Sequence, residues 1–191
     1  MDIDKITKAN TNYIGKRVVY FEEIDSTQLE AKRNKQKYEN GTIIIADIQT
    51  AGKGTHGRIW HTKSNNIAMT IVLKPQANIK QLEGFTVSIA EHIKNVVKKL
   101  YNINLEVKLP NDLLLNNKKI CGILTEVITV QENIKELFIG IGFNVNEDEF
   151  SNDILNIATS LYNETKQRYC REDIICEIIE NIEKELDTRI F

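Results

Sequence analysis

The chain has little of several residue types that often reveal what a protein does. Its 191 residues include one tryptophan, two prolines and three cysteines. No stretch of about 18 consecutive apolar residues occurs, which argues against a membrane-spanning helix. The first residues, Met1–Lys5, lack the apolar stretch of a secretion signal. We therefore expect a cytoplasmic protein that does not associate with membranes.

The cysteines and histidines form no metal-binding pattern. Cys121, Cys170 and Cys176 are an odd set without the paired spacing of zinc ligands. The three histidines match no zinc signature either. We interpret all three cysteines as small side chains that are buried or half-buried.

The charge of the chain excludes a further class of partner. With 25 basic and 27 acidic residues the net charge is −2, so DNA or an anionic membrane would not be attracted in bulk. Hydrophobic residues make up 41% and charged residues 27% of the chain, as in an ordinary globular protein. The length suits one sizeable domain.

Hydrophobic patterning predicts many strands and a few helices. Strands are predicted at residues 17–21, 42–48, 67–73, 105–109, 113–115, 120–130 and 134–145. Helices are predicted at residues 26–37, at 79–100 and from 171 onward. Asp25 has capping-box spacing to Gln28, and residues 116–119 suit a hairpin turn. This order predicts one α+β domain with a mixed sheet.

A glycine-rich loop follows the second predicted strand. Gly52, Gly54 and Gly57 have the spacing of a dinucleotide-binding loop, but no helical pattern begins within them, as that motif requires. The phosphate-binding loop of ATPases does not fit either, because the partner glycine is missing. Closely spaced glycines still let backbone N–H groups surround an anion, and Lys53 and Arg58 add positive charge. We predict phosphate binding here; an exposed basic turn is the alternative.

Two later regions combine charged residues with turns or glycines. Lys108 and Asp112 flank a proline between two predicted strands. A lysine there can neutralise phosphate charge and an aspartate can hold Mg²⁺ or accept a proton, although Pro, Asn and Asp also make ordinary turns. Gly122 and the segment Gly140–Gly142 place glycines inside two neighbouring strands. These glycines fit either a flat slot for a planar ligand or a bulge at a corner of the sheet.

Taken in order, these regions resemble the catalytic domain of the biotin–protein ligases. The matching segments are D-S-T-Q at 25–28, Q-T-A-G-K-G-T-H-G-R-I-W at 49–60, K-L-P-N-D at 108–112, K-I-C-G-I-L at 119–124, G-I-G-F-N-V-N at 140–146 and A-T-S-L at 158–161. The family patterns that they resemble are S-T-N, Q-x-A-G-R-G-R-x-G-R-x-W, K-W-P-N-D, K-x-x-G-I-L, G-I-G-I-N-V-N and A-T-S-L. The resemblance runs from about residue 17 to the C-terminus.

The resemblance implies a role for each matching residue. The residues implied to bind biotin are Ser26, Thr27, Gln28, Gln49, Lys53, Gly54, Thr55, Lys119, Gly122 and Leu124. Those implied to bind ATP or the adenylate are Gly52, Gly57, Arg58, Trp60, Asn111 and Asn144. The implied catalytic residues are Lys108, Arg58 and Asp112, and Asp112 is also the candidate ligand of Mg²⁺.

The resemblance also implies a fold and an activity. The fold would be a mixed, mostly antiparallel sheet of about seven strands flanked by helices, like the cores of class II aminoacyl-tRNA synthetases. The activity would join biotin to ATP, with Mg²⁺, as biotinyl-adenylate, and then pass biotin to a lysine of the biotin carboxyl carrier domain of a carboxylase. Pairing at a sheet edge would support docking of the carrier or a homodimer.

The length of the chain sets an expectation about domains. The family usually adds a small C-terminal β-barrel, and some members begin with a DNA-binding helix-turn-helix. Since 191 residues leave room for neither, we expect one catalytic domain over residues 1–191 and no binding of DNA.

Two other functions remain open at this point. Lipoate–protein ligases resemble the same family in fold and share its chemistry, although the glycine-rich loop and residues 119–124 favour biotin. A non-catalytic binder of biotin or adenylate is the second alternative. The presence of Lys108, Asp112, Arg58 and Lys119 argues against it, since a binder needs no groups that handle phosphate.

The glycine-rich loop generates the first prediction. Thr55 and Lys53 stand where the family often has two arginines, and less fixed positive charge holds an adenylate less tightly. A Thr55→Arg variant should retain biotinyl-adenylate about tenfold longer, measured as the rate of its release from purified protein. Equal retention by the two proteins would contradict this.

Overall fold

Seven strands pair into one sheet in the computed structural model, which describes residues 1–63 and 65–190. The strands are β1 (Val18–Ile24), β2 (Thr42–Gln49), β3 (Ile67–Leu73), β4 (Glu106–Lys108), β5 (Asp112–Leu115), β6 (Lys118–Val130) and β7 (Asn133–Phe143). Their order across the sheet is β1-β2-β3-β7-β6-β5-β4. Only β1 and β2 are parallel among these pairs, which confirms the predicted mixed, mostly antiparallel sheet.

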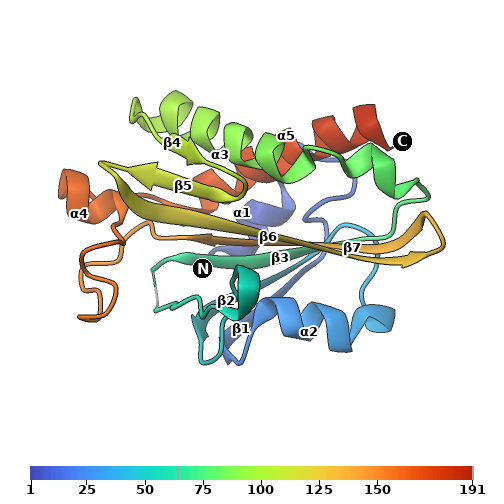
Figure 1. Ribbon diagram of the computed structural model, residues 1–191, viewed down its shortest axis with the longest axis horizontal. Helices are drawn as coiled ribbons and strands as arrows, with labels where there is room; N and C mark the ends of the chain where they lie inside the picture. Colours follow the sequence, from blue (N-terminus) through green and yellow to red (C-terminus); the bar gives the residue numbers. More distant parts are fainter. Residues whose placement is uncertain (64, 191) are drawn as a thin grey trace.

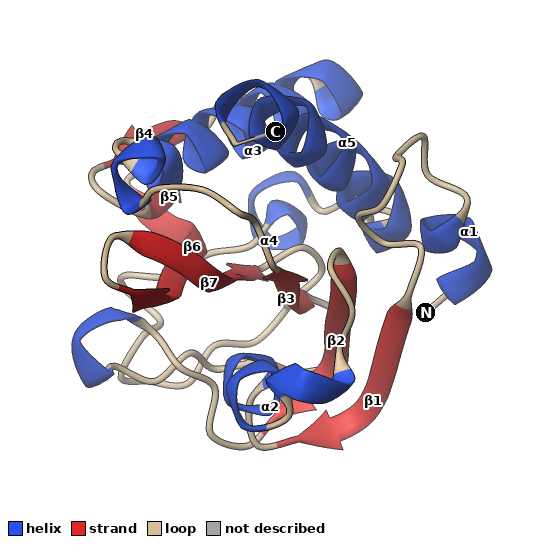
Figure 2. Ribbon diagram, turned by 90° about the vertical axis from the view of Figure 1, so that its right-hand side faces the viewer, coloured by secondary structure: helices blue, strands red, loops and turns tan. Residues whose placement is uncertain are grey.

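Helices cover the two faces of the sheet unequally. The α-helices are α1 (Ile3–Thr7), α2 (Thr27–Arg33), α3 (Phe85–Tyr101), α4 (Leu161–Thr165) and α5 (Arg171–Arg189), and the 3₁₀ helices are η1 (Lys35–Lys37), η2 (Thr55–Gly57) and η3 (Ile79–Leu82). Figures 1 and 2 show α1, α3 and α5 on one face and α2 on the other. In the described part of the chain, no helix is both long and apolar enough to cross a membrane.

Most of the apolar core lies on the face that α3 and α5 cover. Alternate residues of the central strands, such as Ile43, Met69 and Ile141, are buried there with Ile89 of α3 and Ile178 of α5. Each such side chain contributes about 1.5–3 kcal/mol when fully buried. The opposite face has a much smaller apolar cluster, which consists of Ala31, Ile44, Val72 and Phe138 with partly buried neighbours. The remainder of that face is therefore available for polar residues and loops.

Two predicted helices differ from the observed ones. Ser26, and not Asp25, caps α2: its Oγ accepts a hydrogen bond from the Leu29 N–H at 3.4 Å. The Asp25 carboxylate instead pairs with Arg33 at 2.6 Å, and the helix ends there. The helix predicted at 79–100 is divided into η3 and α3, because Gly84 between them adopts a left-handed φ of +71°.

The cysteine prediction is confirmed for two residues and wrong for the third. Cys121 is buried and Cys176 is half-buried. Cys170 is exposed, because it is the residue before the first turn of α5, at the surface.

A buried carboxylate fixes the segment that precedes β1. Glu183 of α5 is 4% exposed. It accepts hydrogen bonds from the backbone N–H groups of Asn12, Tyr13 and Ile14, the last two at 3.0 and 2.8 Å. These bonds join the N-terminal segment to the last helix, although about 170 residues separate them.

This contact predicts a stability effect. Glu183→Ala removes the acceptor of three N–H groups and should lower the free energy of unfolding by about 3 kcal/mol, measured by urea denaturation. Glu39→Ala is the control, because the ion pair of Glu39 with Arg17 is exposed and its loss should change stability little. A Glu183 variant as stable as the Glu39 variant would refute the anchoring role.

Candidate active site

One row of residues crosses the sheet on the face that carries α2. Across β4, β5, β6, β7 and β3, the residues that pair in succession are Lys108, Asp112, Gly122, Gly142 and Ala68. Directly paired residues point to the same face of a sheet. The row therefore begins with a lysine and a carboxylate and continues as a floor without large side chains.

The indole ring of Trp60 lies flat on this floor. A Cβ atom on Gly142 would lie 2.3 Å from Cε2 of the ring, and one on Gly122 would lie 3.1 Å from Cζ3. The ring nitrogen is buried and has no hydrogen-bond partner among the described residues, and Nζ of Lys119 lies 5.4 Å from the ring centroid. The strand glycines thus form a flat surface, the first of the two possibilities that the sequence left open.

The glycine-rich loop holds Trp60 in this place by folding as a hairpin. The Trp60 N–H donates to the Gly52 carbonyl at 2.9 Å and the Gly54 N–H donates to the Arg58 carbonyl at 2.8 Å. Gly52 is required at this point, because a Cβ there would lie 2.3 Å from the carbonyl oxygen of Trp60. Gly52 therefore supports the loop and lines neither of the two cavities described next.

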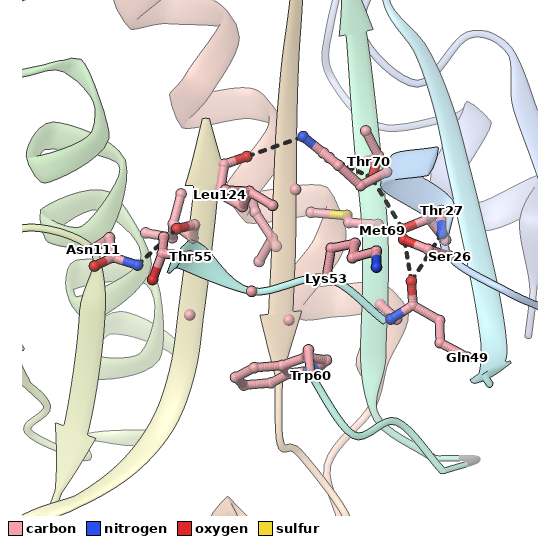
Figure 3. Close-up of a pocket in the computed structure, with 18 of the residues that line it drawn as sticks. Ser26, Thr27, Gln49, Lys53, Thr55, Trp60, Met69, Thr70, Asn111 and Leu124 are labelled. Atoms are coloured by element: carbon pink, nitrogen blue, oxygen red, sulfur yellow. Dashed lines mark hydrogen bonds between the residues drawn. The ribbon is translucent and has the colours of Figure 1, made fainter. Parts of the chain in front are cut away.

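A first cavity lies between this loop, α2 and the sheet (Figure 3). All ten residues implied to bind biotin line it: Ser26, Thr27, Gln28, Gln49, Lys53, Gly54, Thr55, Lys119, Gly122 and Leu124. Figure 3 shows Thr27 and Gln49 at one end and Asn111 and Thr55 at the other, with Lys53 between them. Asn111, predicted to contact the nucleotide, lines this cavity and donates from Nδ2 to the Ile123 carbonyl at 3.0 Å.

One end of the first cavity is a network of buried polar groups. The N–H and hydroxyl of Thr27 donate to Oε1 of Gln49 at 2.9 and 3.1 Å. The hydroxyl of Thr70 lies 3.0 Å from Oγ1 of Thr27 and 3.0 Å from Oε1 of Gln28. Thr27, Gln28 and Thr70 are each at most 3% exposed. Desolvated donors and acceptors of this kind favour a ligand that can hydrogen-bond to them.

A second cavity lies on the other side of the loop. Four residues of the implied nucleotide set line it, namely Gly57, Arg58, Trp60 and Asn144. Part of its wall is apolar and consists of Phe150, Ile154, Ile157 and Ala158. Its volume is about 510 Å³, against about 40 Å³ for the first cavity. Small-molecule sites usually measure about 300–1,000 Å³, so the loop and Trp60 have to move before a ligand fills the first cavity.

The two cavities share a wall, and the charged groups gather beside it. Gly54, Thr55, Trp60 and Lys119 line both cavities. The Lys119 ammonium lies 2.6 Å from Oδ1 of Asp112.

Two of the implied catalytic cations are not held at this wall. Arg58 folds back onto its own loop, where its guanidinium donates to the carbonyl of Thr55 at 3.2 Å and to its hydroxyl at 2.9 Å. Lys108 is exposed, lines neither cavity, and stands at the end of the floor beside Asp112. The structure therefore brings Lys119 and Asp112 into contact and leaves Arg58 and Lys108 at the edges.

Two other side chains near the wall have structural roles. Burial raises the pKa of the Cys121 thiol well above its usual range, so it stays protonated and packs as an apolar group. Nδ2 of Asn144 donates to the carbonyl of Thr159 at 3.0 Å. That bond joins the end of β7 to the segment A-T-S-L.

The candidate magnesium ligand does not form part of a metal cluster. Among the described residues, no group of three or more His, Cys, Asp or Glu side chains could hold a metal ion. Asp112 is already paired with Lys119. The residues at this place therefore do not make a Mg²⁺ site by themselves.

Sequence reasoning missed part of the lining of both cavities. Thr70 was assigned only to an apolar strand, yet its hydroxyl lies at the centre of the polar network. A single threonine inside the run I-A-M-T-I-V-L is the signal that would have found it. Phe150 and Ile154 belong to a segment without periodicity, and no local pattern placed them beside the loop.

Comparisons with known proteins point to one family. The model of the biotin/lipoate A/B protein ligase family matches residues 18–144, well over half of the chain. The bifunctional ligase/repressor BirA of Bacillus spizizenii is 34% identical over 178 residues, which cover 91% of this chain and 55% of that protein. The biotin–[acetyl-CoA-carboxylase] ligase of Paracoccus denitrificans is 33% identical over 124 residues, which cover 63% of this chain and 51% of that protein. The chain thus spans about half the length of these relatives.

A solved structure shows the same fold. The biotin protein ligase of Aquifex aeolicus in complex with biotin and ATP superposes with a TM-score of 0.79 at 28% identity, covering 91% of this chain and 71% of that one.

The position of Trp60 gives a spectroscopic prediction. Gly142→Ala should push the indole off the floor, because the new methyl group would lie within 3 Å of the ring. Trp60 is the single tryptophan of the chain, so its fluorescence emission should shift to longer wavelength as water reaches it.

Gly140→Ala is the matched control for this experiment. A Cβ on Gly140 would meet Oε1 of Gln28 at 2.7 Å and not the indole. The fluorescence emission of the Gly140→Ala variant should match that of the unmodified protein. An unchanged spectrum in the Gly142 variant would mean that Trp60 does not lie on the floor.

Proposed function

Because the chain belongs to the biotin/lipoate A/B protein ligase family, we propose that it activates biotin with ATP and transfers it to a lysine of a biotin carboxyl carrier domain. Residues 1–191 would act as one catalytic domain. The relatives and solved structures that carry the name biotin ligase support this proposal. The proposal concerns ligation only and not the repressor function in the name of one relative.

The shared wall of the two cavities is the observation on which the proposal rests. The first cavity has a polar end and the second has apolar residues together with Arg58. Biotin would lie in the first cavity with its ring at Thr27 and Gln49, and ATP would lie in the second. The biotin carboxylate and the α-phosphate would then meet beside Lys119, which lines both.

In the first step a carboxylate oxygen of biotin attacks the α-phosphorus of ATP, and pyrophosphate leaves. Both reactants are anionic, so the step needs fixed positive charge and in-line placement. Lys119 would neutralise the carboxylate and Lys108 the charge that develops on the phosphate. Mg²⁺ would arrive with the ATP phosphates, as it commonly does in such sites, and Asp112 would add one carboxylate ligand.

In the second step the amine of the acceptor lysine attacks the carbonyl carbon of biotinyl-adenylate, and AMP leaves. The nitrogen loses a proton, which Asp112, the carboxylate of the floor row, would accept. Water would hydrolyse the mixed anhydride, so the hairpin of Gly52–Trp60 has to cover it until the acceptor arrives. The hairpin already lies over the first cavity in this conformation.

The polar end of the first cavity favours biotin over lipoate. The ring of biotin is a cyclic urea with two N–H donors and one carbonyl acceptor. The dithiolane ring of lipoate offers no comparable partner, so the buried groups of Thr27, Gln49 and Thr70 would meet a ligand that cannot bond to them. Sites built around such groups reject the analogue that lacks the partner.

A direct assay tests the proposed activity. The purified protein is incubated with ATP, Mg²⁺, a carrier domain and either biotin or lipoate, and the carrier is weighed by intact mass spectrometry. We expect a biotinyl adduct and no lipoyl adduct. Lys108→Ala should slow transfer about a hundredfold or more, whereas Lys98→Ala, an exposed lysine of α3 on the other face, should not.

Each other result changes the proposal in a defined way. Lipoyl transfer in place of biotinyl transfer would assign the chain to the lipoate branch of the family. Absence of any adenylate with either acid would contradict the ligase function and favour a non-catalytic binder.

A further inference from the structure

The orientation of the Gln28 side-chain amide is determined by its neighbours. Nε2 lies 2.9 Å from a carboxylate oxygen of Glu126 and 3.4 Å from the carbonyl oxygen of Leu124. Both neighbours can only accept hydrogen bonds, so the NH₂ group has to face them. Oε1 consequently points the other way, into the first cavity, where it would touch a Cβ on Gly140 at 2.7 Å.

Oε1 of Gln28 determines which way the hydroxyl of Thr70 donates its hydrogen bond. The hydroxyl of Thr70 lies 3.0 Å from Oε1 of Gln28 and donates to it, since Oε1 has no proton. Oγ1 of Thr70 also lies 3.0 Å from Oγ1 of Thr27, whose own hydroxyl proton is donated to Oε1 of Gln49. A carbonyl oxygen has two lone pairs, so Oε1 keeps one for a ligand that lies on the glycine floor.

Glu126 is itself held by an ion pair. Nζ of Lys32, one turn after Gln28 on α2, lies 2.9 Å from the second carboxylate oxygen of Glu126. The side chains of Lys32 and Glu126 are 39% and 35% exposed, so the pair contributes little to stability. Its effect is on position, because the carboxylate stays beside the Gln28 amide.

We propose that Glu126 is a positioning residue for substrate recognition: together with Lys32 it fixes the Gln28 amide so that an acceptor faces the ring N–H groups of a bound cyclic urea. This inference rests on the proposed function and extends it to a residue that does not line the cavity. A freely rotating amide would present its NH₂ group to those N–H groups part of the time and lose the bond. Glu126 therefore acts on ligand selectivity and not on the reacting atoms.

A second ion pair provides a matched control. Glu136 of β7 pairs with Lys35 of η1 at 3.3 Å, so it also joins the segment after α2 to the sheet. In the described part of the chain, none of the hydrogen bonds of the Gln28 side-chain amide involves Glu136. Glu136→Met and Glu126→Met remove the same kind of bond between the same layers, and only the second removes an acceptor from the Gln28 amide.

The test measures binding of three ligands by titration calorimetry: biotin and its two ring-N-methylated derivatives, in which one N–H donor is blocked. In the unmodified protein, at least one methylated form should bind much more weakly than biotin. Glu126→Met should weaken the binding of biotin about tenfold. It should weaken the binding of that methylated form less, so that the ratio of the two affinities shrinks. Lys32→Met should change the affinities for biotin and for that methylated form in the same direction, by a smaller factor.

Three readouts separate a positioning role from a purely structural one. The KM for biotin should rise in Glu126→Met while the KM for ATP stays constant, and the melting temperature should match that of Glu136→Met. If discrimination stays intact in Glu126→Met, or falls equally in Glu136→Met, the proposal is wrong. Should Glu126→Met fail to fold, Glu126→Gln supplies the same comparison, because its amide no longer forces the NH₂ group of Gln28 toward it.

Failure of the proposed function would look different. If the unmodified protein bound none of the three ligands, the assignment of biotin itself would fall. If it bound biotin well and Glu126→Met did too, only the role of Glu126 would be refuted.

Discussion

The alternation of side chains across the sheet is the constraint on which the site depends. Alternate residues of β3, β6 and β7, such as Met69, Ile123 and Ile141, are committed to the core under α3 and α5. The residues between them face the opposite side, where only α2 and the loops cover the sheet. Gly122, Gly142 and Ala68 make that side flat enough for the indole of Trp60 to rest on the backbone. The core thus supplies rigidity to the floor.

The second requirement is that each cation beside the site has a protein partner that holds its side chain. Lys119 achieves this by a close contact with Asp112 and by its position over the Trp60 ring. Arg58 satisfies its guanidinium on its own loop. In this conformation both cations have protein partners. A bound anion would have to replace those partners, and the free energy of that exchange lowers the apparent affinity for any single ligand.

The sequence predicted the sheet and the residues that line the cavities better than it predicted where helices and strands begin and end. Strand β3 was found because it is a nearly continuous apolar run, and α5 because burial of one helix face leaves a repeating pattern. The cap of α2 was misassigned by one residue, since Asp25 and Ser26 are both good caps and only the tertiary pairing of Asp25 with Arg33 decides between them. Helices α1 and α4, of five residues each, are too short to show a period. The contact of Gln28 with Glu126 spans 98 positions, and no local pattern encodes it.

The wall common to the two cavities has a thermodynamic consequence. A ligand on either side of Gly54, Thr55, Trp60 and Lys119 contacts the same four residues. Whichever ligand binds first fixes their positions, and the second finds the wall already fixed. Linkage then requires the effect to be reciprocal: the factor by which one ligand tightens the other is the same in both directions. The coupling by itself therefore imposes no order of binding on the two ligands.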